Sequence, residues 1–408
     1  MRMIDMNLLD VQLYNKTIGS ITLIPGDRSI FAFNDEYVQN LDRETLSLSF
    51  KNPHGELITN FRATGPVLQP FFSNLLPEGP LRDFLARKMH VKPAREFHLI
   101  WGLGADLPGA VTVIPIEGDS LPVEIKGNED EETQTDEVLR FSLAGVQLKF
   151  SAIRTEDRLT IPAKGIGGAW IVKLPSERFE AVPENEYSFM TLAGMIGIDV
   201  PEIQLINVSE IQGIPDGLGR LRNERAFAIK RFDRTDSEAV HIEDFAQVFN
   251  LRPDDKYGKQ SYRNIAYVIG VESDISDLEE FIRRLVFSTL IGNEDMHLKN
   301  WSLIYRDRRR PSLSPAYDML STIPYIHNKT AALKFSRTNK MAEFDMGELA
   351  HLASKALIPE KLVIDTAKDT VEKFMEVWHR EKRNLFLTKE IIETVEKHFI
   401  TLRILGEI

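Results

Sequence analysis

The sequence predicts an α+β fold in which a strand-rich part faces a helical part. Two observations support this class. Short apolar runs bounded by turn residues fill most of the chain before Ile242, as expected for β-strands. Beyond Ile242, apolar residues recur mainly at helical spacing. Strands first and helices afterwards are typical of two lobes that pack against each other.

The first third of the chain is predicted to form strands and turns, followed by helices. Val11–Tyr14 and Ile18–Ile24 flank Asn15-Lys16 and predict a hairpin. Leu46–Phe50 alternates polar and apolar residues, as a half-buried strand does. Helical spacing begins near Val67. Two further strands are predicted at Ser29–Phe33 and Val111–Ile116.

The acidic segment Glu117–Glu137 has little apolar content and predicts a mobile linker. The expected strands after it are Gln147–Ile153, Trp170–Leu174, Gln204–Val208 and Ala226–Phe232. The expected helices are Glu184–Ile196, Phe281–Leu290, Lys361–Glu381 and Lys389–Ile404.

Composition excludes several classes of protein. The net charge of −11 argues against nucleic-acid binding over a whole face. Arg306–Arg310 is locally basic and predicts a solvated loop between two strands, with a contact to phosphate or to an acidic partner as the alternative. The absence of cysteine excludes disulfides, thiolate zinc sites and a cysteine nucleophile. No apolar run reaches the length of about 18 residues typical of a membrane span. The simplest expected location is a reducing cytoplasm, and the absence of cysteine also suits other compartments.

The segment Gly292–Asn300 carries the sharpest chemical signal. Asp295 and Asn300 stand five positions apart, which is the spacing of the Asp and Asn in a protein-kinase catalytic loop. In that chemistry the carboxylate orients and deprotonates an acceptor hydroxyl, and the amide oxygen ligates magnesium. The spacing alone is a weak signal that occurs by chance in many proteins.

Two further residues strengthen this signal by their order in the chain. Asp318 follows a strand-like segment after the loop, as the metal-binding Asp of a kinase does. Lys173 lies in the middle of an apolar strand, where an unpaired ammonium is costly. ATP phosphates and an acid of the next helix, either Glu184 or Glu186, are its expected partners. The alternative without a function is that Lys173 faces solvent from an edge strand.

Other candidate residues are less specific. Ser142–Lys149 and Lys164–Gly168 both contain glycines that permit close backbone approach to phosphate, but neither matches a known phosphate-loop pattern. His297 has no second histidine at metal-ligand spacing, so we expect it to hydrogen-bond the backbone of the loop.

Seven motifs in order resemble those of the HipA-like kinases, the toxins of bacterial toxin–antitoxin pairs. They are Phe71–Gly79, Pro108–Val111, Ser142–Lys149, Lys173–Pro175, Arg231–Arg234, Gly292–Asn300 and Pro315–Asp318. The resemblance spans nearly the whole chain. Lys230 stands where the family often has Glu, and Leu148 replaces an acid common in the loop.

The resemblance implies a two-lobed protein-kinase-like fold of the PI3/4-kinase-like type. Its mixed α/β N-terminal lobe would carry an extra N-terminal subdomain, and its C-terminal lobe would be all-helical. The expected boundaries are 1–118 for the subdomain, 119–139 for the linker, 140–238 for the nucleotide-binding part and 239–408 for the helical lobe with the catalytic loop.

The resemblance also implies a serine/threonine protein kinase with ATP and Mg²⁺ as cofactors. Asp295, Lys173 and Asn300 would be catalytic, Asn300 and Asp318 would hold Mg²⁺, and Ser142 would be autophosphorylated. The implied ATP-binding residues are Ala144, Gly145, Val146, Gln147, Leu148, Lys149, Lys173, Lys230, Arg231, Phe232, His297, Lys299, Asn300, Tyr317 and Asp318.

The implied partners are a helix-turn-helix antitoxin, operator DNA bound through that antitoxin, and a protein substrate. Family targets are aminoacyl-tRNA synthetases, the glutamyl enzyme above all, whose phosphorylation stalls translation and arrests growth. Two alternatives stay open. One is a kinase-fold enzyme acting on a small molecule or lipid, and the other is a co-repressor that binds nucleotide without catalysis.

Overall fold

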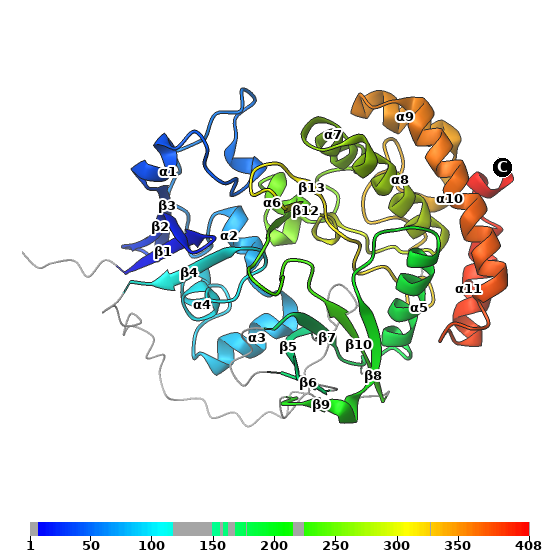
Figure 1. Cartoon of the computed structure of the whole chain (residues 1–408), viewed down its shortest axis with the longest axis horizontal. Coiled ribbons are helices and arrows are strands. Elements are labelled where there is room, and N and C mark those ends of the chain that lie inside the picture. The colour runs from blue at the N-terminus through cyan, green and yellow to red at the C-terminus, as the bar shows by residue number, and fades with distance from the viewer. Residues whose placement is uncertain are drawn as a thin grey trace, which may run out of the picture.

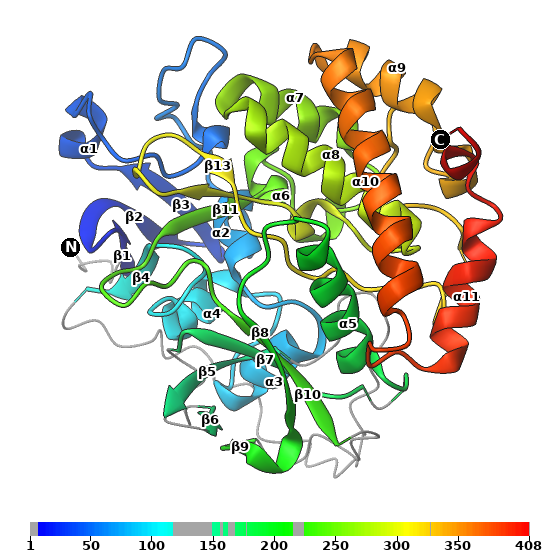
Figure 2. The same ribbon diagram turned by 45° about the vertical axis from the view of Figure 1, so that its right-hand side comes forward.

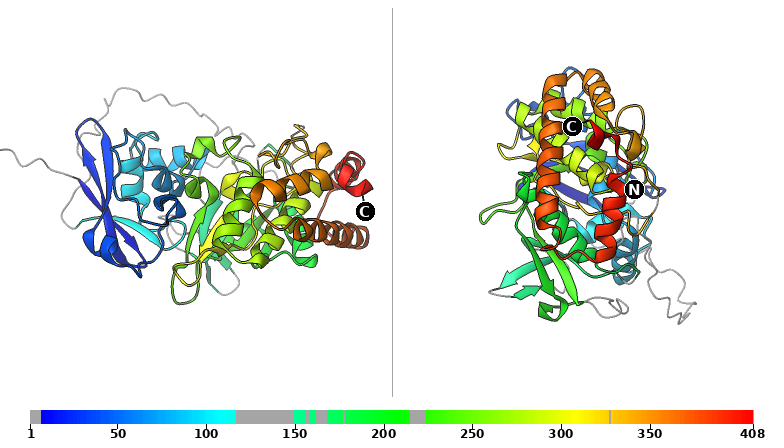
Figure 3. Two further views of the ribbon diagram at one scale, coloured as in Figure 1. Left: turned by 90° about the horizontal axis from the view of Figure 1, so that it is seen from above. Right: turned by 90° about the vertical axis from the view of Figure 1, so that its right-hand side faces the viewer.

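The computed structural model of the chain describes residues 7–116, 149–155, 158–161, 168–176, 178–214, 224–326 and 328–407. The molecule is elongated, with the first strands at one end and the last helices at the other (Figure 3). A small sheet with its helices, a second sheet and a large group of helices follow one another in the order of the chain (Figures 1 and 2).

The N-terminal subdomain, residues 7–116, is built on a four-stranded antiparallel sheet in the order β3-β2-β1-β4. Its strands are β1 (Leu8–Leu13), β2 (Lys16–Ile24), β3 (Arg28–Phe33) and β4 (Val111–Pro115). The predicted hairpin is confirmed, but its turn lies at Tyr14 and Asn15 rather than at Asn15-Lys16. Both turn residues have positive φ, which matches the twist of the flanking strands.

Four helices accompany this sheet. They are α1 (Asp35–Gln39), α2 (Pro70–Leu75), α3 (Gly79–Lys88) and α4 (Glu96–Leu103). Phe71 and Phe72 of α2 are fully buried and fill a core with Phe31 and Phe50. This packing fixes α2 and the turn after it against the rest of the protein.

The predicted strand at Leu46–Phe50 is wrong. Leu48–Phe50 forms a single 3₁₀ turn, because the Ser47 hydroxyl accepts the Ser49 N–H and caps it. The Ser47 hydroxyl and the Leu48 N–H also donate to the carboxylate of Glu243, 196 and 195 residues away. These hydrogen bonds to the distant Glu243 carboxylate therefore favour a 3₁₀ turn over the strand that the alternating pattern predicted.

The second sheet has six strands in the order β8-β10-β7-β5-β6-β9. They are β5 (Lys149–Thr155), β6 (Arg158–Thr160), β7 (Trp170–Lys173), β8 (Ile203–Asn207), β9 (Ile211–Gln212) and β10 (Arg225–Lys230). Helix α5 (Val182–Met195) packs on β8 and β10. All four strands predicted here are present, and β7 lies between β5 and β10.

The C-terminal lobe is mainly helical, and the two-lobed fold is confirmed. Its helices are α6 (Phe245–Val248), α7 (Tyr262–Glu272), α8 (Ile275–Leu290), α9 (Met346–Ala356), α10 (Glu360–Glu381) and α11 (Lys389–Phe399). Phe287 and Trp378 lie in its buried core. Among the described helices, none combines the length and the apolar character that crossing a membrane requires.

This lobe is not all-helical, which corrects one detail of the predicted fold. Strands β11 (His241–Asp244), β12 (Ser302–Tyr305) and β13 (Ser312–Leu313) form a small antiparallel sheet. β11 pairs with β12 over its whole length, so a segment expected to start the helical region completes a sheet instead. Helix α11 also ends at Phe399 rather than at Ile404, which lies in a 3₁₀ turn.

Glu243 on β11 is a buried carboxyl group between the subdomain and the C-terminal lobe. It accepts hydrogen bonds from Ser47, Leu48 and Tyr305, and burial raises its pKa from 4.5 to about 7. The unfolded chain therefore loses this proton at a lower pH than the folded protein does. Stability contributed by the protonated group is present below pH 4.5 and is lost as the pH rises to about 7.

We expect Glu243→Gln to remove this pH dependence. At about 1.4 kcal/mol per pKa unit, the free energy of unfolding of the wild type falls by roughly 2.5 kcal/mol more between pH 5 and pH 8 than that of the variant. Urea unfolding of both proteins at the two pH values measures the difference. Identical pH dependence in the two proteins contradicts the assignment.

Candidate active site

Lys173 at the end of β7 is buried, with 3 % of its surface exposed. Its ammonium contacts the carboxylates of Glu186 on α5 and of Asp318. The structure thus selects Glu186 over Glu184 as the helix partner, and Lys173 does not face solvent. Burial alone would lower the pKa of Lys173, but the two adjacent carboxylates outweigh it and raise the pKa, so the ammonium stays charged.

Asp318 accepts a second ammonium, that of Lys149, at 2.8 Å. Lys149 on β5 lies opposite Lys173 in the strand register, so two neighbouring strands direct lysines at one carboxylate. Burial would raise the pKa of Asp318, but the two lysines lower it far below its usual range. Asp318 also has a φ of 56°, a left-handed conformation that a non-glycine residue adopts only when its surroundings hold it.

The catalytic-loop candidate starts where α8 ends. Gly292 has a φ of 68°, and a Cβ there would lie 2.5 Å from Ile323, so only glycine fits this turn. The loop is then tied internally: the Asn300 amide donates to the carbonyl of Asp295 at 2.9 Å, and the Asp295 N–H donates to the Asn293 side chain at 3.0 Å. These bonds fix Asp295 and Asn300 relative to each other.

The Asp295 carboxylate accepts a hydrogen bond of 2.6 Å from the hydroxyl of Tyr257. Burial raises the pKa of Asp295, while Tyr257 lowers it, and the net pKa lies above the ordinary value. The charge on Asp318 also acts on Asp295. Sequence reasoning missed Tyr257, which lies in a turn-rich stretch without a recognisable motif.

His297 differs from expectation. Its Nδ1 is buried and has no hydrogen-bond partner among the described residues, so the expected bond to the loop backbone is not made through this atom. The ring packs edge-on against Tyr257, with centroids 5.1 Å apart. Burial lowers the pKa of His297 to about 3, which keeps the imidazole neutral.

Three of the predicted ATP-binding residues, Lys230, Arg231 and Phe232, follow one another at the end of β10. The ring of Phe232 lies 5.7 Å from that of Tyr317, whose hydroxyl donates to the carbonyl of Lys299 at 2.9 Å. The N–H groups of Lys230 and Arg231 are occupied by the carbonyls of Glu202 and Ala169, at 2.9 and 2.7 Å. The Lys230 side chain is exposed, 3.8 Å from the Glu202 carboxylate.

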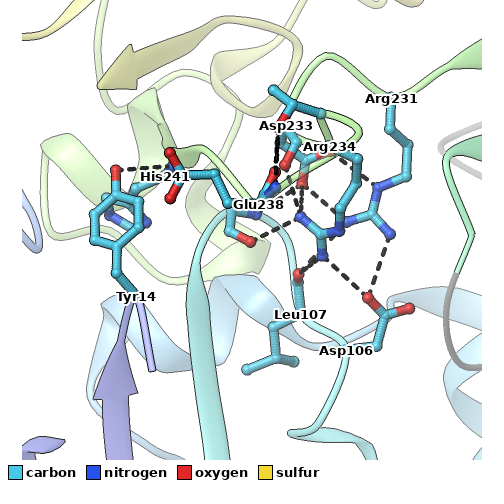
Figure 4. A network of polar contacts seen from close by, with 10 residues as sticks. Tyr14, Asp106, Leu107, Arg231, Asp233, Arg234, Glu238 and His241 are labelled. Atoms are coloured by element: carbon cyan, nitrogen blue, oxygen red, sulfur yellow. Dashed lines mark hydrogen bonds and ion pairs between the residues drawn. The ribbon is translucent and has the colours of Figure 1, made fainter. Parts of the chain in front are cut away.

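The Arg231 side chain points away from this edge, toward the N-terminal subdomain (Figure 4). It pairs with Asp233 at 2.8 Å and with Asp106 at 3.4 Å. Arg234 contacts the same two acids at 2.8 and 3.0 Å. Gly109, with a φ of 77°, donates its N–H to Asp233 at 2.8 Å. The network therefore joins the segment after β10 to the loop before β4.

Replacing Asp233 with Asn leaves Arg231 and Arg234 without this buried counter-charge. We expect a loss of about 3 kcal/mol in unfolding free energy, because removing one partner of a buried ion pair is costly even though Asp106 still contacts both arginines. Asp42→Asn is the control, since Asp42 pairs with Arg309 at 2.8 Å but is 85 % exposed, and it should cost less than about 1 kcal/mol. Equal losses in chemical denaturation contradict the structural role of the network.

Part of the predicted site lies outside the described residues: Ser142, Ala144, Gly145, Val146, Gln147 and Leu148, together with Lys164–Gly167 and the linker 119–139. Lys149 is the first residue after this gap. Over the described part of the chain, no group of three or more histidine, aspartate or glutamate side chains is arranged to hold a metal ion. Arg306–Arg310 forms the mostly exposed loop between β12 and β13, as predicted.

Lys299 is turned toward the N-terminal subdomain. Its ammonium contacts the Glu78 carboxylate at 2.6 Å and the Asn74 carbonyl at 3.0 Å. Ion pairs thus join Lys149, Lys173, Glu186 and Asp318, and a loop hydrogen bond joins Asn300 to Asp295. Sequence reasoning gave no role to Glu78.

Comparison with known proteins gives a consistent result over both parts of the chain. Family models for the HipA N-terminal domain and the HipA-like C-terminal domain match residues 9–114 and 141–378. A relative from Sinorhizobium fredii named "Putative kinase Y4dM" is 57% identical over 98% of each chain. The "Serine/threonine-protein kinase toxin HipA" of Shewanella oneidensis is 24% identical over 78% of this chain and 76% of its own.

A solved structure shares the fold. The HipA chain in a complex of the Shewanella oneidensis toxin–antitoxin proteins HipA and HipB with operator DNA superposes with a TM-score of 0.73 and 21% identity. The match covers 98% of this chain and 97% of that one. The two-lobed arrangement described above is therefore shared with a known toxin kinase.

Proposed function

The chain belongs to the HipA family, and from that premise we propose that it transfers the terminal phosphate of ATP to a serine or threonine of a protein. One observation carries the proposal: a buried lysine, Lys173, is paired with Glu186 of the next helix and with Asp318, whose charge also acts on Asp295. This is the arrangement that phosphate transfer requires for binding charged phosphates and orienting a hydroxyl.

The residues divide the work by their chemistry. Lys173 and Lys149 supply fixed positive charge for the phosphates. In this structure both ammonium groups pair with the Asp318 carboxylate. Asp295 orients the acceptor hydroxyl and takes its proton, and Tyr257 holds the Asp295 carboxylate in place. Phe232 and Tyr317 offer aromatic surface on the adenine side.

Asp318 and Asn300 fit the needs of Mg²⁺. Asp318 is ionised, and Asn300 uses its amide nitrogen within the loop, which leaves its oxygen for a ligand. Both are hard oxygen donors of the kind Mg²⁺ prefers. When bound, Mg²⁺ neutralises charge on the phosphates.

We also propose the biological setting that the family implies. The chain would bind a helix-turn-helix antitoxin and, through it, operator DNA, repressing its own operon. Its substrate would be an aminoacyl-tRNA synthetase such as the glutamyl enzyme, with growth arrest as the outcome, and Ser142 would be autophosphorylated. The Shewanella oneidensis complex with HipB and operator DNA supports the first of these. The boundaries at 118, 139 and 238 remain predictions, as does the cytoplasmic location.

Incubation with labelled ATP and magnesium tests the activity. We expect label on the wild type at Ser142, located by mass spectrometry, and none on Asp295→Gln. Ser142→Ala should lose the label on itself but still phosphorylate an added protein substrate. Equal labelling of wild type and Asp295→Gln, or no labelling of any protein across magnesium concentrations, contradicts the proposal.

A further inference from the structure

The turn between α2 and α3 brings the N-terminal subdomain against the lobe that carries the catalytic loop. Gln247 donates to the carbonyl of Phe71 at 3.0 Å, and the Asn74 amide donates to the carbonyl of Leu251 at 2.7 Å. Asn74 is 5 % exposed. This part of the subdomain is therefore fixed to the C-terminal lobe by buried polar contacts.

Glu78 lies at the start of α3, between two lysines of the C-terminal lobe. Its Oε2 is 2.6 Å from the Lys256 ammonium and its Oε1 is 2.6 Å from that of Lys299. The side chains of Lys256 and Lys299 are only 11% and 15% exposed. Burial would raise the pKa of Glu78, but the two lysines lower it to about 2, so the carboxylate stays ionised at neutral pH.

Each of the two lysines is next in sequence to a residue that forms or contacts the catalytic-loop candidate. Lys256 directly precedes Tyr257, whose hydroxyl holds the Asp295 carboxylate. The carbonyl of Lys256 also accepts the N–H of Leu298 at 3.4 Å. Lys299 directly precedes Asn300. The Glu78 carboxylate therefore contacts the residue next to Tyr257 and the residue next to Asn300.

We propose that Glu78 is a positioning residue that holds Tyr257 and the Asp295–Asn300 loop in the geometry for phosphate transfer. This rests on the proposed kinase function. Glu78 touches no reacting group itself and acts through Lys256 and Lys299. Removing its charge leaves two largely buried ammonium groups without the counter-charge that they share, with only the Asp244 carboxylate still 3.9 Å from Lys299. Both segments then become freer to move.

Kinetics of Glu78→Gln test the proposal. We expect kcat to fall about 10- to 100-fold with a smaller change in the KM for ATP, because displacements near 1 Å at a reacting group cost rates of this order. Glu78→Asp, which keeps the charge, should recover most of the rate. The matched control is Glu44→Gln: Glu44 belongs to the same subdomain and also contacts two cations, Lys16 at 3.0 Å and Arg308 at 4.0 Å.

Hydrogen exchange of the free protein separates this proposal from the proposed function. We expect the amides of residues 293–300 to exchange faster in Glu78→Gln than in the wild type or in Glu44→Gln. Hydrogen exchange can be measured without enzyme activity. A wild type without kinase activity would therefore contradict the proposed function, and the exchange of the loop amides would still test the role of Glu78. Unchanged loop exchange, or a rate loss no larger than that of Glu44→Gln, overturns the proposal.

Discussion

Asp295→Asn is expected to lower the rate of phosphate transfer by about 10²- to 10⁴-fold, the usual contribution of a general base. The amide keeps the size of the carboxylate and can still accept the Tyr257 hydroxyl, which donates at 2.6 Å to the native residue. The loop bonds through the Asp295 backbone are untouched. Stability and nucleotide affinity should therefore stay near those of the wild type.

The pH dependence of the wild type supplies a second readout for this residue. The pKa of Asp295 is raised by burial, so the base is lost by protonation at a higher pH than for an ordinary aspartate. We expect kcat to fall on the acid side through that raised pKa and the residual rate of Asp295→Asn to lack this limb. A full-rate Asp295→Asn enzyme contradicts the role of Asp295.

Lys173→Met is expected to abolish detectable transfer and to destabilise the fold. It leaves Glu186, which is 1 % exposed, without its cation. Removing one member of a buried ion pair costs about 3–5 kcal/mol. The unpaired Glu186 carboxyl group can become neutral by taking up a proton. The loss of unfolding free energy should therefore be largest at neutral pH and smaller at lower pH.

Lys149→Met is the matched control. Lys149 contacts the same Asp318 carboxylate at 2.8 Å, but its side chain is 40% exposed. Its removal should cost less than about 1 kcal/mol of stability. Chemical denaturation of both variants at pH 5 and 7.5 measures the contrast. Equal destabilisation by the two changes contradicts the buried pairing of Lys173 with Glu186.

The order of the chemical motifs was readable from the sequence because each is short and local. The structure pairs Lys173 with Asp318, and the charge of Asp318 acts on Asp295. The choice of Glu186 over Glu184 was not readable, because both lie on the first two turns of α5 and only the rotation of the helix against β7 decides.

Contacts between distant segments account for what sequence reasoning missed. Tyr257 lies 38 residues before Asp295, and its neighbours carry no pattern that distinguishes it from other turn residues. Glu78 lies within a recognised motif, yet its partners are 178 or more residues away. The prediction of a strand at Leu46–Phe50 was wrong for the same reason, because the Ser47 hydroxyl donates to the distant carboxylate of Glu243.

Nucleotide binding and phosphate transfer should be measured on the same preparations of wild type, Asp295→Asn and Lys173→Met, because together they separate loss of the catalytic base from loss of the nucleotide site. Calorimetry gives ATP affinity, and label from ATP on protein gives transfer. We expect binding and transfer by the wild type, binding without transfer by Asp295→Asn, and no transfer by Lys173→Met. Undiminished transfer by either variant would contradict the assignment of this site as the kinase centre.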